Sequence, residues 1–256
     1  TTGGNNTAAG YKALEANTTA SNNTAFGFEA LNDNTTGTQN VSVGAYALDA
    51  NTTADNNTAL GYRPLTSNTT GANNTAIGVF ALDANTTAGN NTAVGYNSLA
   101  SNTTGTQNVS LGAFALNANT TADDNTGLGY YALVSNTTGT QNVAVGTFAL
   151  DANTTGGQGT AVGYNSLGAN TTGSENSALG RNSLSSNTTG AGNVAMGSNA
   201  MRDNSTGSNN TSVGFTSMKV NTTGEQNTAV GAYALDANTT GQYNTALGSQ
   251  ALTNNT

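Results

Sequence analysis

The sequence contains no cysteine, no histidine and no tryptophan, and only one proline among its 256 residues. The absence of Cys excludes a thiol nucleophile and a disulfide framework. Without Cys and His, the commonest general base and the usual transition-metal ligands are also missing. Charged residues make up 7% of the chain, and a uniform sequence singles out no pair of opposed carboxylates such as glycoside cleavage needs. We therefore expect no enzymatic activity, no cofactor and no metal site.

Basic residues are equally scarce. The formal net charge is −8, and the five basic residues lie far apart in the sequence, at Lys12, Arg63, Arg181, Arg202 and Lys219. No basic stripe exists, so we expect no nucleic-acid partner. No apolar run approaches the roughly 20 residues that span a bilayer, so we expect no membrane insertion. The chain opens with neither Met nor a signal-peptide pattern, from which we expect a mature or excised segment.

What the sequence does contain is a strict repeat of 17 residues. Fifteen glycines follow this spacing without insertion or deletion, at Gly10, Gly27, Gly44, Gly61, Gly78, Gly95, Gly112, Gly129, Gly146, Gly163, Gly180, Gly197, Gly214, Gly231 and Gly248. A clear unit is NTAVGYNSLASNTTGTQ, residues 91–107, whose residues we number as positions 1 to 17. Fifteen such frames open between Asn6 and Asn244. We predict one repeat domain covering residues 1–256.

Each position of the unit follows its own rule. Position 1 is Asn except at Gly159, position 3 is small, position 4 is apolar, position 5 is Gly, and position 9 is Leu or Met. Positions 12 to 14 are Asn-Thr-Thr, broken only by Ser205, and Gly or Ala follows. Disordered chains lack such regular apolar positions, so periodicity outweighs the low hydrophobicity of the chain.

The repeat predicts an all-β fold. A Gly and an Asn-Thr-Thr-Gly run in every unit would interrupt any helix within about three turns. The segments TAV and YNSL are typical of short strands, with a bend at Gly and a turn at Asn-Thr-Thr-Gly. We predict a parallel β-solenoid, a β-roll or β-helix, of fifteen 17-residue coils. At a rise of about 4.8 Å per coil it would form a rod of roughly 70 Å, with Leu stacked on Leu and Asn on Asn.

Two expectations concern the interior and the rings. We expect positions 4 and 9 to form the core. Aromatic residues alternate between position 6 (Phe28, Tyr62, Tyr96, Tyr130, Tyr164) and position 7 (Tyr46, Phe80, Phe114, Phe148). Because adjacent strand positions point to opposite faces, rings of consecutive coils should lie on different sides. The alternation is explained either by packing against a neighbouring chain or by duplication of a two-unit block.

The ends of the chain suggest two hypotheses about assembly. Thr1 and Thr256 are both the first Thr of an Asn-Thr-Thr run, and neither end carries a recognisable cap. A bare solenoid end exposes unpaired amides that another edge can join. Either the segment was cut from a longer array, or subunits stack end to end into a filament.

The units NTAVGYNSL (residues 91–99) and NTAIGVFAL (residues 74–82) resemble the head repeats of trimeric autotransporter adhesins. They are still more similar to the Asn-Thr-rich repeats of bacterial and phage tail-fibre-type proteins. The resemblance covers essentially the whole chain. It implies a parallel β-roll or β-helix, assembly as a homotrimer, an extracellular or cell-surface location, and a role in surface attachment.

The sequon Asn-X-Thr recurs in fourteen successive turns, at Asn17, Asn34, Asn51, Asn68, Asn85, Asn102, Asn119, Asn136, Asn153, Asn170, Asn187, Asn204, Asn221 and Asn238. In a cell that performs N-glycosylation, these sites would place a row of glycans along one edge of the rod and make the chain a glycoprotein. The alternative interpretation is that Asn-Thr-Thr is turn chemistry, since Asn tolerates left-handed geometry.

Two further surface features have competing interpretations. Rows of Thr suggest ice binding, but the paired Thr are adjacent and should point oppositely, which leaves Asn and the second Thr on one face. Acidic residues recur at position 10, at Asp49, Asp83, Asp151 and Asp236. They could bind calcium between coils. Most coils lack an acid at this position, however, which favours solvated charge that limits lateral aggregation.

The sequence thus predicts a structural extracellular fibre or filament segment that self-assembles, as a homotrimer or end to end. The alternatives are a β-solenoid adhesin that binds a receptor, a cell surface or its glycans, and an ice-binding protein. An adhesive face should depart from the repeat, and only the irregular coils from Arg181 to Lys219 do so.

Overall fold

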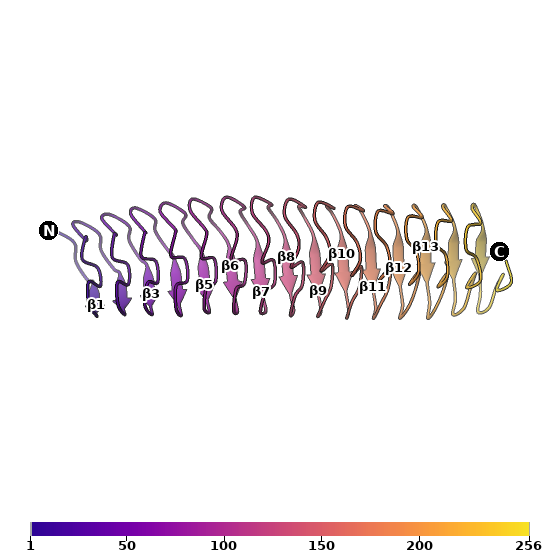
Figure 1. The fold of residues 1–256 in the computed structure, drawn as a ribbon, viewed down its shortest axis with the longest axis horizontal. Helices are drawn as coiled ribbons and strands as arrows, with labels where there is room; N and C mark the ends of the chain where they lie inside the picture. The colour runs from indigo at the N-terminus through magenta and orange to yellow at the C-terminus, as the bar shows by residue number, and fades with distance from the viewer. Residues whose placement is uncertain (1, 256) are drawn as a thin grey trace. The chain divides into compact units, whose positions relative to one another are not determined.

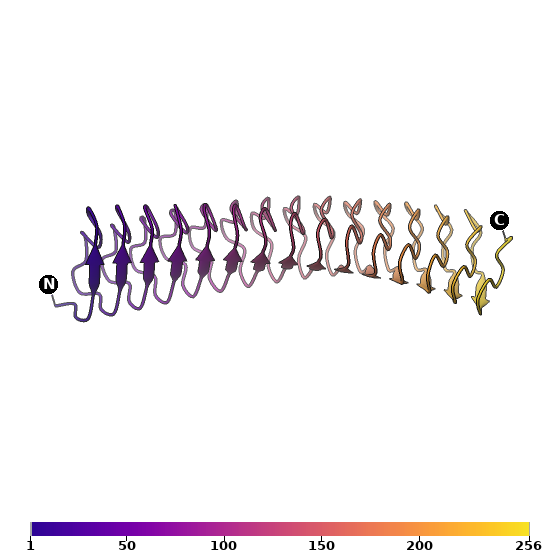
Figure 2. The ribbon, with the colours of Figure 1, turned by 90° about the horizontal axis from the view of Figure 1, so that it is seen from below.

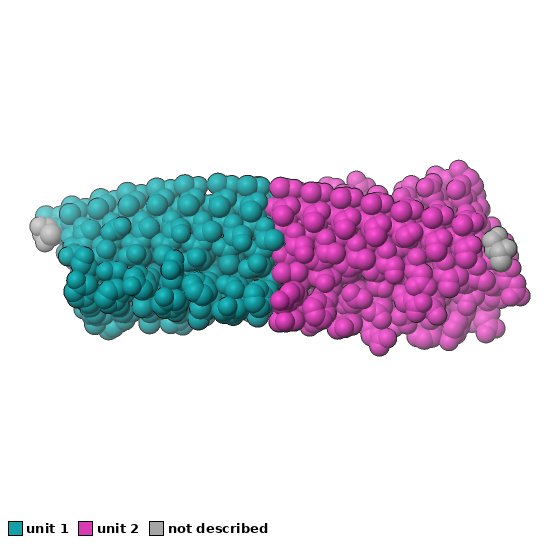
Figure 3. All heavy atoms as spheres, in the orientation of Figure 1, with its two compact units in different colours: residues 1–125 teal, residues 126–256 magenta. Residues whose placement is uncertain are grey.

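One three-residue strand forms in each repeat of the computed structural model, which describes residues 2–255. The chain divides into two compact units, Thr1–Asn125 and Thr126–Thr256, which Figure 3 colours separately. Thr1 and Thr256, on which the interpretation of the chain ends depends, lie outside the described residues. The prediction of one domain over residues 1–256 stays a prediction.

Unit 1 contains β1 (Thr7–Ala9), β2 (Thr24–Phe26), β3 (Val41–Val43), β4 (Thr58–Leu60), β5 (Thr75–Ile77), β6 (Thr92–Val94) and β7 (Val109–Leu111). Unit 2 contains β8 (Thr126–Leu128), β9 (Val143–Val145), β10 (Thr160–Val162), β11 (Ser177–Leu179), β12 (Val194–Met196), β13 (Thr211–Val213), β14 (Thr228–Val230) and β15 (Thr245–Leu247). No helix occurs among the described residues.

Within each unit the strands pair in sequence order and all run in the same direction. Each residue pairs with its equivalent 17 positions later, as Thr75 does with Thr92 in unit 1 and Thr160 with Ser177 in unit 2. Figures 1 and 2 show the strands of each unit side by side, with the turns of successive coils stacked in the same way. Both units are therefore parallel β-solenoids, and the predicted fold class is confirmed.

The segment after each Gly is a turn, so the prediction of a second strand in YNSL is wrong. Asn97 and Leu99 have φ angles of 52° and 53°, in the left-handed region that bends the chain. Their amides still reach the adjacent coils: that of Asn97 donates to the Val79 carbonyl at 3.0 Å, and that of Leu99 to the Ala115 carbonyl at 3.0 Å. The turn therefore keeps the ladder between coils while it closes each coil.

Gly at position 5 is required by conformation and by packing. Gly163 has a φ angle of 132°, which residues with a Cβ rarely adopt. A Cβ at this position would lie 2.6 Å from the carbonyl oxygen of Gly180, one coil further on. The column of glycines therefore lets successive backbones approach closely at a sharp bend.

The interior of each coil is narrow. Beside the buried Asn residues of positions 1 and 12, it is filled mainly from positions 3, 8 and 9. Ala93, Ser98 and Leu99 represent these positions, and each is fully buried. Position 4 faces the other way: Leu179 is 47% exposed and Met196 is 43% exposed. The prediction of position 9 as core is confirmed, and that of position 4 is wrong. Strand alternation turns either position 3 or position 4 inward, and only the small residue fits beside Leu.

Replacing Gly163 by Ala tests the requirement at position 5. We expect the free energy of unfolding to fall by at least about 3 kcal/mol, because the backbone strain and the clash with Gly180 add. The control is Gly157→Ala, at position 16 of an adjacent turn, which should change the free energy of unfolding by less than about 1 kcal/mol. Neighbouring coils have Thr140 and Ser174 at the same position, so a side chain is accepted there. Urea unfolding followed by circular dichroism measures both, and equal midpoints would contradict the role of the glycine column.

Candidate functional site

No group of three or more Asp, Glu, Cys or His residues within residues 2–255 could hold a metal ion. The same residues contain no helix of the length and hydrophobicity that crossing a membrane requires. The features with functional potential are the asparagine ladders, the turn threonines, the aromatic rows, the position-10 acids, the irregular coils and the outward side chains of the strands.

Asn at position 12 forms a buried hydrogen-bonded ladder. Asn187 is fully buried. Its Nδ2 donates to Oδ1 of Asn170 at 2.9 Å and to the Gly190 carbonyl at 2.9 Å. Its own Oδ1 accepts from Nδ2 of Asn204 at 2.9 Å. The same side-chain links connect residues 34 to 119 in unit 1 and residues 136 to 255 in unit 2. The predicted stacking of Asn on Asn is confirmed.

Asn at position 1 forms a second ladder with different connections. Oδ1 of Asn57 accepts the backbone N–H of Asn74, one coil on, at 2.9 Å, and its Nδ2 donates to the Gly71 carbonyl at 2.9 Å. Asn68, from position 12, donates to the same Gly71 carbonyl at 2.9 Å. The two asparagines of a coil thus both donate to the carbonyl of position 15. These hydrogen bonds close the coil, and the bonds to Asn74 and to the other asparagines link it to its neighbours.

A glycan at position 12 does not fit this geometry. It would be attached to Nδ2, the atom whose two hydrogens serve the ladder and the turn. Thirteen of the fourteen predicted sites, from Asn34 to Asn238, are at most 1% exposed, and Asn17 is half-buried. The folded coil has no room for the predicted row of glycans, so we interpret Asn-Thr-Thr as turn chemistry. Burial, which sequence alone did not show for a turn residue, decides between the two interpretations.

The two threonines of the turn have different surroundings. Thr188 is half-buried, and its Oγ1 donates to the Ser205 carbonyl of the next coil at 3.0 Å, whereas Thr189 is exposed. The expectation that Asn187 and Thr189 share a face is wrong, because turn residues do not follow strand alternation. Only one row of these hydroxyls faces solvent. A single row gives no two-dimensional hydroxyl lattice, so the turn does not favour ice binding.

The rings of consecutive coils contact one another in short rows. These run from Tyr11 to Phe80 and from Tyr96 to Phe114 in unit 1, and from Tyr130 to Tyr164 and from Phe215 to Tyr233 in unit 2. Tyr62 lies edge to face with Tyr46 and Phe80 of the adjacent coils, at centroid distances of 6.2 and 5.7 Å. Phe148 lies in the same way between Tyr130 and Tyr164, at 5.8 and 6.0 Å. The expectation of rings on different sides is wrong, because positions 6 and 7 belong to the turn after Gly. Such pairs contribute about 0.5–1.5 kcal/mol each, so the rows reinforce the stacking of the coils.

The position-10 acids remain separate from one another. Asp83 lies 3.7 Å from Nε of Arg63 in the preceding coil. Burial raises the pKa of Asp151. Burial, and after it repulsion from Asp33, raises the pKa of Asp49. A calcium site needs several converging oxygen ligands. Within residues 2–255 no position-10 acid belongs to such a group, which favours the interpretation as surface charge.

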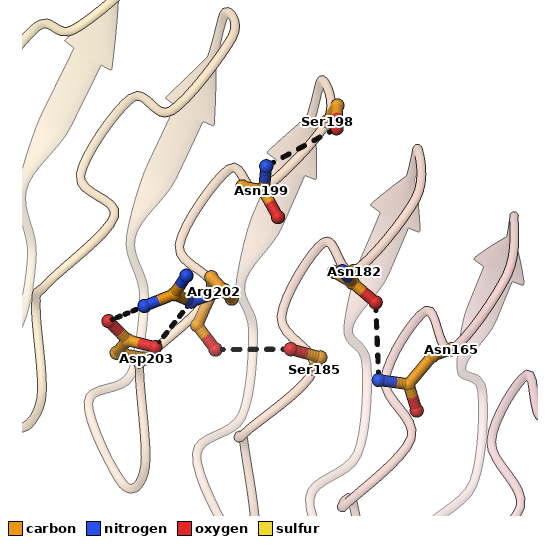
Figure 4. A network of polar contacts seen from close by, with 7 residues as sticks. All are labelled: Asn165, Asn182, Ser185, Ser198, Asn199, Arg202 and Asp203. Carbon is orange, nitrogen blue, oxygen red and sulfur yellow. Dashed lines mark hydrogen bonds and ion pairs between the residues drawn. The ribbon is translucent and has the colours of Figure 1, made fainter.

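Several polar side chains around Arg202 make local contacts, as Figure 4 shows. Nε and Nη2 of Arg202 donate to the two carboxylate oxygens of Asp203 at 2.7 and 2.8 Å. Oγ of Ser185 donates to the Arg202 carbonyl at 3.5 Å, and Nδ2 of Asn165 donates to Oδ1 of Asn182 at 3.3 Å. The charge of Arg202 is thus paired locally. These contacts do not favour the segment from Arg181 to Lys219 as an adhesive site.

The outward side chains of the strands form a surface that sequence reasoning missed. Position 3 is buried in every strand from β2 to β15, so positions 2 and 4 point away from the interior. Position 2 is Thr, Val or Ser, and position 4 is apolar in all fifteen repeats. We call the side chains at positions 2 and 4 the outer sheet face. The available signal was that position 3 is always small whereas position 4 is apolar. It was masked because position 3 is Ala in most repeats, so both positions look hydrophobic there.

In unit 2 the outer sheet face is hollowed into an apolar groove of about 260 Å³ over β10, β11 and β12. The exposed fractions of Leu179 and Met196, 47% and 43%, are large for aliphatic side chains. The groove is lined by Thr160, Val162, Ser177, Ala178, Leu179, Val194 and Met196.

Replacing Asn187 by Asp tests the position-12 ladder. A carboxylate would face the acceptor oxygens of Asn170 and Gly190, so we expect a loss of about 3–5 kcal/mol at neutral pH. Because burial raises the pKa of a carboxyl, the loss should shrink when acid pH neutralises the group. Asn209→Asp, at exposed position 17, is the control and should cost less than about 0.5 kcal/mol. Urea unfolding at pH 7 and at acid pH measures both, and similar losses in the two variants would rule out the proposed ladder.

A second prediction concerns Asp151. Burial raises its pKa in the folded state, so its contribution to stability is present in acid and is lost as the pH rises through the folded pKa. Asp151→Asn removes the buried charge and should make the protein more stable than the parent at pH 7. The difference should close in acid, where the parent carboxyl is neutral. Thermal unfolding across this pH range measures it, and a difference independent of pH would refute the explanation.

Comparisons with known proteins add no assignment. No protein-family description, no curated protein and no solved structure matches this chain. The resemblance of its repeats to adhesin heads and tail-fibre-type proteins therefore stays a prediction.

Proposed function

We propose that this chain is a structural segment of an extracellular fibre or filament and that it self-assembles. The observation that carries the proposal is the coil-to-coil hydrogen bonding within each unit. Strands pair in register with the next coil, as Ala76 does with Ala93, and the asparagine ladders run beside them. Such a unit can be extended by further coils without any change in cross-section.

The chemistry of the side chains supports a mechanical role. Several polar side chains of the repeat form hydrogen bonds between coils. They are the amides at positions 1 and 12 and the hydroxyl of the first Thr of the turn. Thr171 is an example, since its Oγ1 donates to the Thr188 carbonyl at 3.0 Å. The repeat offers the same side chains in each coil and concentrates none of them in one place. An enzyme concentrates different groups at one site, so we propose no catalytic function.

The proposed location, outside the cell or on its surface, and the proposed homotrimer follow from the resemblance of the repeats. End-to-end assembly follows instead from the unpaired backbone amides that the edge of a solenoid exposes. Adhesion to a receptor or to surface glycans is the second candidate and rests on the same resemblance. Ice binding is the third. The locally paired contacts around Arg202 and the single exposed Thr row give neither alternative specific support.

A fibre segment should consist of elongated particles that resist digestion. We expect small-angle X-ray scattering to give the profile of a rod at low protein concentration. We also expect subtilisin to leave the native chain uncut under conditions that degrade Gly163→Ala, because cleavage requires local opening of stacked coils. Compact particles, or digestion of the parent protein as fast as the variant, would count against a structural role.

A further inference from the structure

We propose that the outer sheet face is an interface between copies of this chain, which pack face to face through it. The proposal rests on the self-assembly proposed above and names the surface and the partner. Its centre in unit 2 is the groove between the side chains of Val162, Leu179 and Met196. Leu179 and Met196 are exposed in the single chain and Val162 is half-buried, and packing against a second copy would remove these side chains from water.

The distribution of charge favours this face over the rest of the coil. Each copy carries a net charge of −8, so two copies repel one another on average. None of the eighteen charged residues occupies positions 1 to 5 of the repeat; they occur at positions 6, 7, 10, 11, 16 and 17. The strands therefore lie in an uncharged stretch of the coil. The turn at positions 12 to 15 is uncharged as well, but it consists of Asn, Thr, Ser, Gly and Ala and offers no large apolar side chain. Two copies that meet at the strands keep their carboxylates apart and in solvent.

The period of the face favours a second copy over an unrelated partner. Its side chains recur every coil, at a spacing of about 4.8 Å set by the pairing of the strands. Facing sheets pack about 10 Å apart when side chains of one fill the gaps of the other. A partner must have the same period to keep this fit over many strands. Another copy of the chain has this period because it contains the same 17-residue repeat.

The variation at position 4 argues against a flat inorganic surface such as ice. Phe26 lies next to Val43 in unit 1, and Met196 lies next to Val213 in unit 2. A planar lattice of water needs side chains of equal height. An interface between proteins instead tolerates different sizes where a large side chain faces a small one.

The size of the face predicts the strength of association. Seven three-residue strands present roughly 340 Å² in unit 1, and eight present roughly 380 Å² in unit 2, from the usual strand spacing and rise. A standard interface buries about 800 Å² per partner. The face of either unit alone falls well short of this, so we expect association that depends on protein concentration.

The test places charge on the groove of the full chain. Sedimentation equilibrium from low micromolar to near-millimolar concentration should show the parent passing from 25.3 kDa to a dimer or higher oligomer. In the triple variant Val162→Glu, Leu179→Glu and Met196→Glu, association should weaken at least tenfold. The matched control carries Glu at the exposed position 14 of the same coils, with Thr172→Glu, Thr189→Glu and Thr206→Glu, and should associate like the parent.

A milder variant keeps the test valid if the triple Glu variant misfolds. Val162→Thr, Leu179→Thr and Met196→Thr keeps strand-forming side chains and should still weaken association, while circular dichroism stays that of the parent. A parent that is monomeric at every concentration would overturn the proposal, and so would variants that associate like the parent. Neither result would change the outcome of the scattering and protease experiments described above, so failure of the interface is distinguishable from failure of the structural role.

Discussion

The hydrogen bonds between successive coils are the constraint on which the rest of the structure depends. A coil buries one large side chain, such as Leu99, beside small ones such as Ala93 and Ser98. This interior is too small to hold 17 residues in place alone. Each coil is therefore ordered by its neighbours, and any residue that spoils the approach of two coils weakens both. The column of glycines and the period without insertions follow from this requirement.

The asparagine ladders show how a narrow interior can be polar and still satisfied. Asn is short and carries two donors and an acceptor, so one side chain reaches its own turn and two neighbouring coils. Asp lacks the donors, and Ser cannot span the distance between coils with as many bonds. The exception at Gly159 fits this account, because its backbone N–H still donates to Oδ1 of Asn142 at 2.8 Å. The interaction with the preceding coil survives without the side chain.

The period of the sequence was sufficient to predict the fold class, the register of the strands, the Leu column and the Asn column. All four depend only on which residues recur every 17 positions. The errors about YNSL, the rings and the turn threonines share one cause, the use of strand geometry outside the three-residue strand. Asn97 and Leu99 are left-handed, and the rings of Tyr46 and Tyr62 meet because the chain turns after Gly. Sequence propensity gave no sign of this, since neither Leu nor Tyr favours positive φ.

The candidate surface was harder to predict than the fold, because in most repeats positions 3 and 4 are both apolar and the width of the coil decides which one is inside. The result has a mechanical consequence. Force along the axis of a unit loads the hydrogen bonds between coils in tension, so a single solenoid would open one coil at a time. Side chains of a second copy that cross several coils, as Leu179 and Met196 would, connect each coil to more than its two neighbours. Coils could then no longer open singly, and a fibre built from such units would resist tension better than one isolated chain.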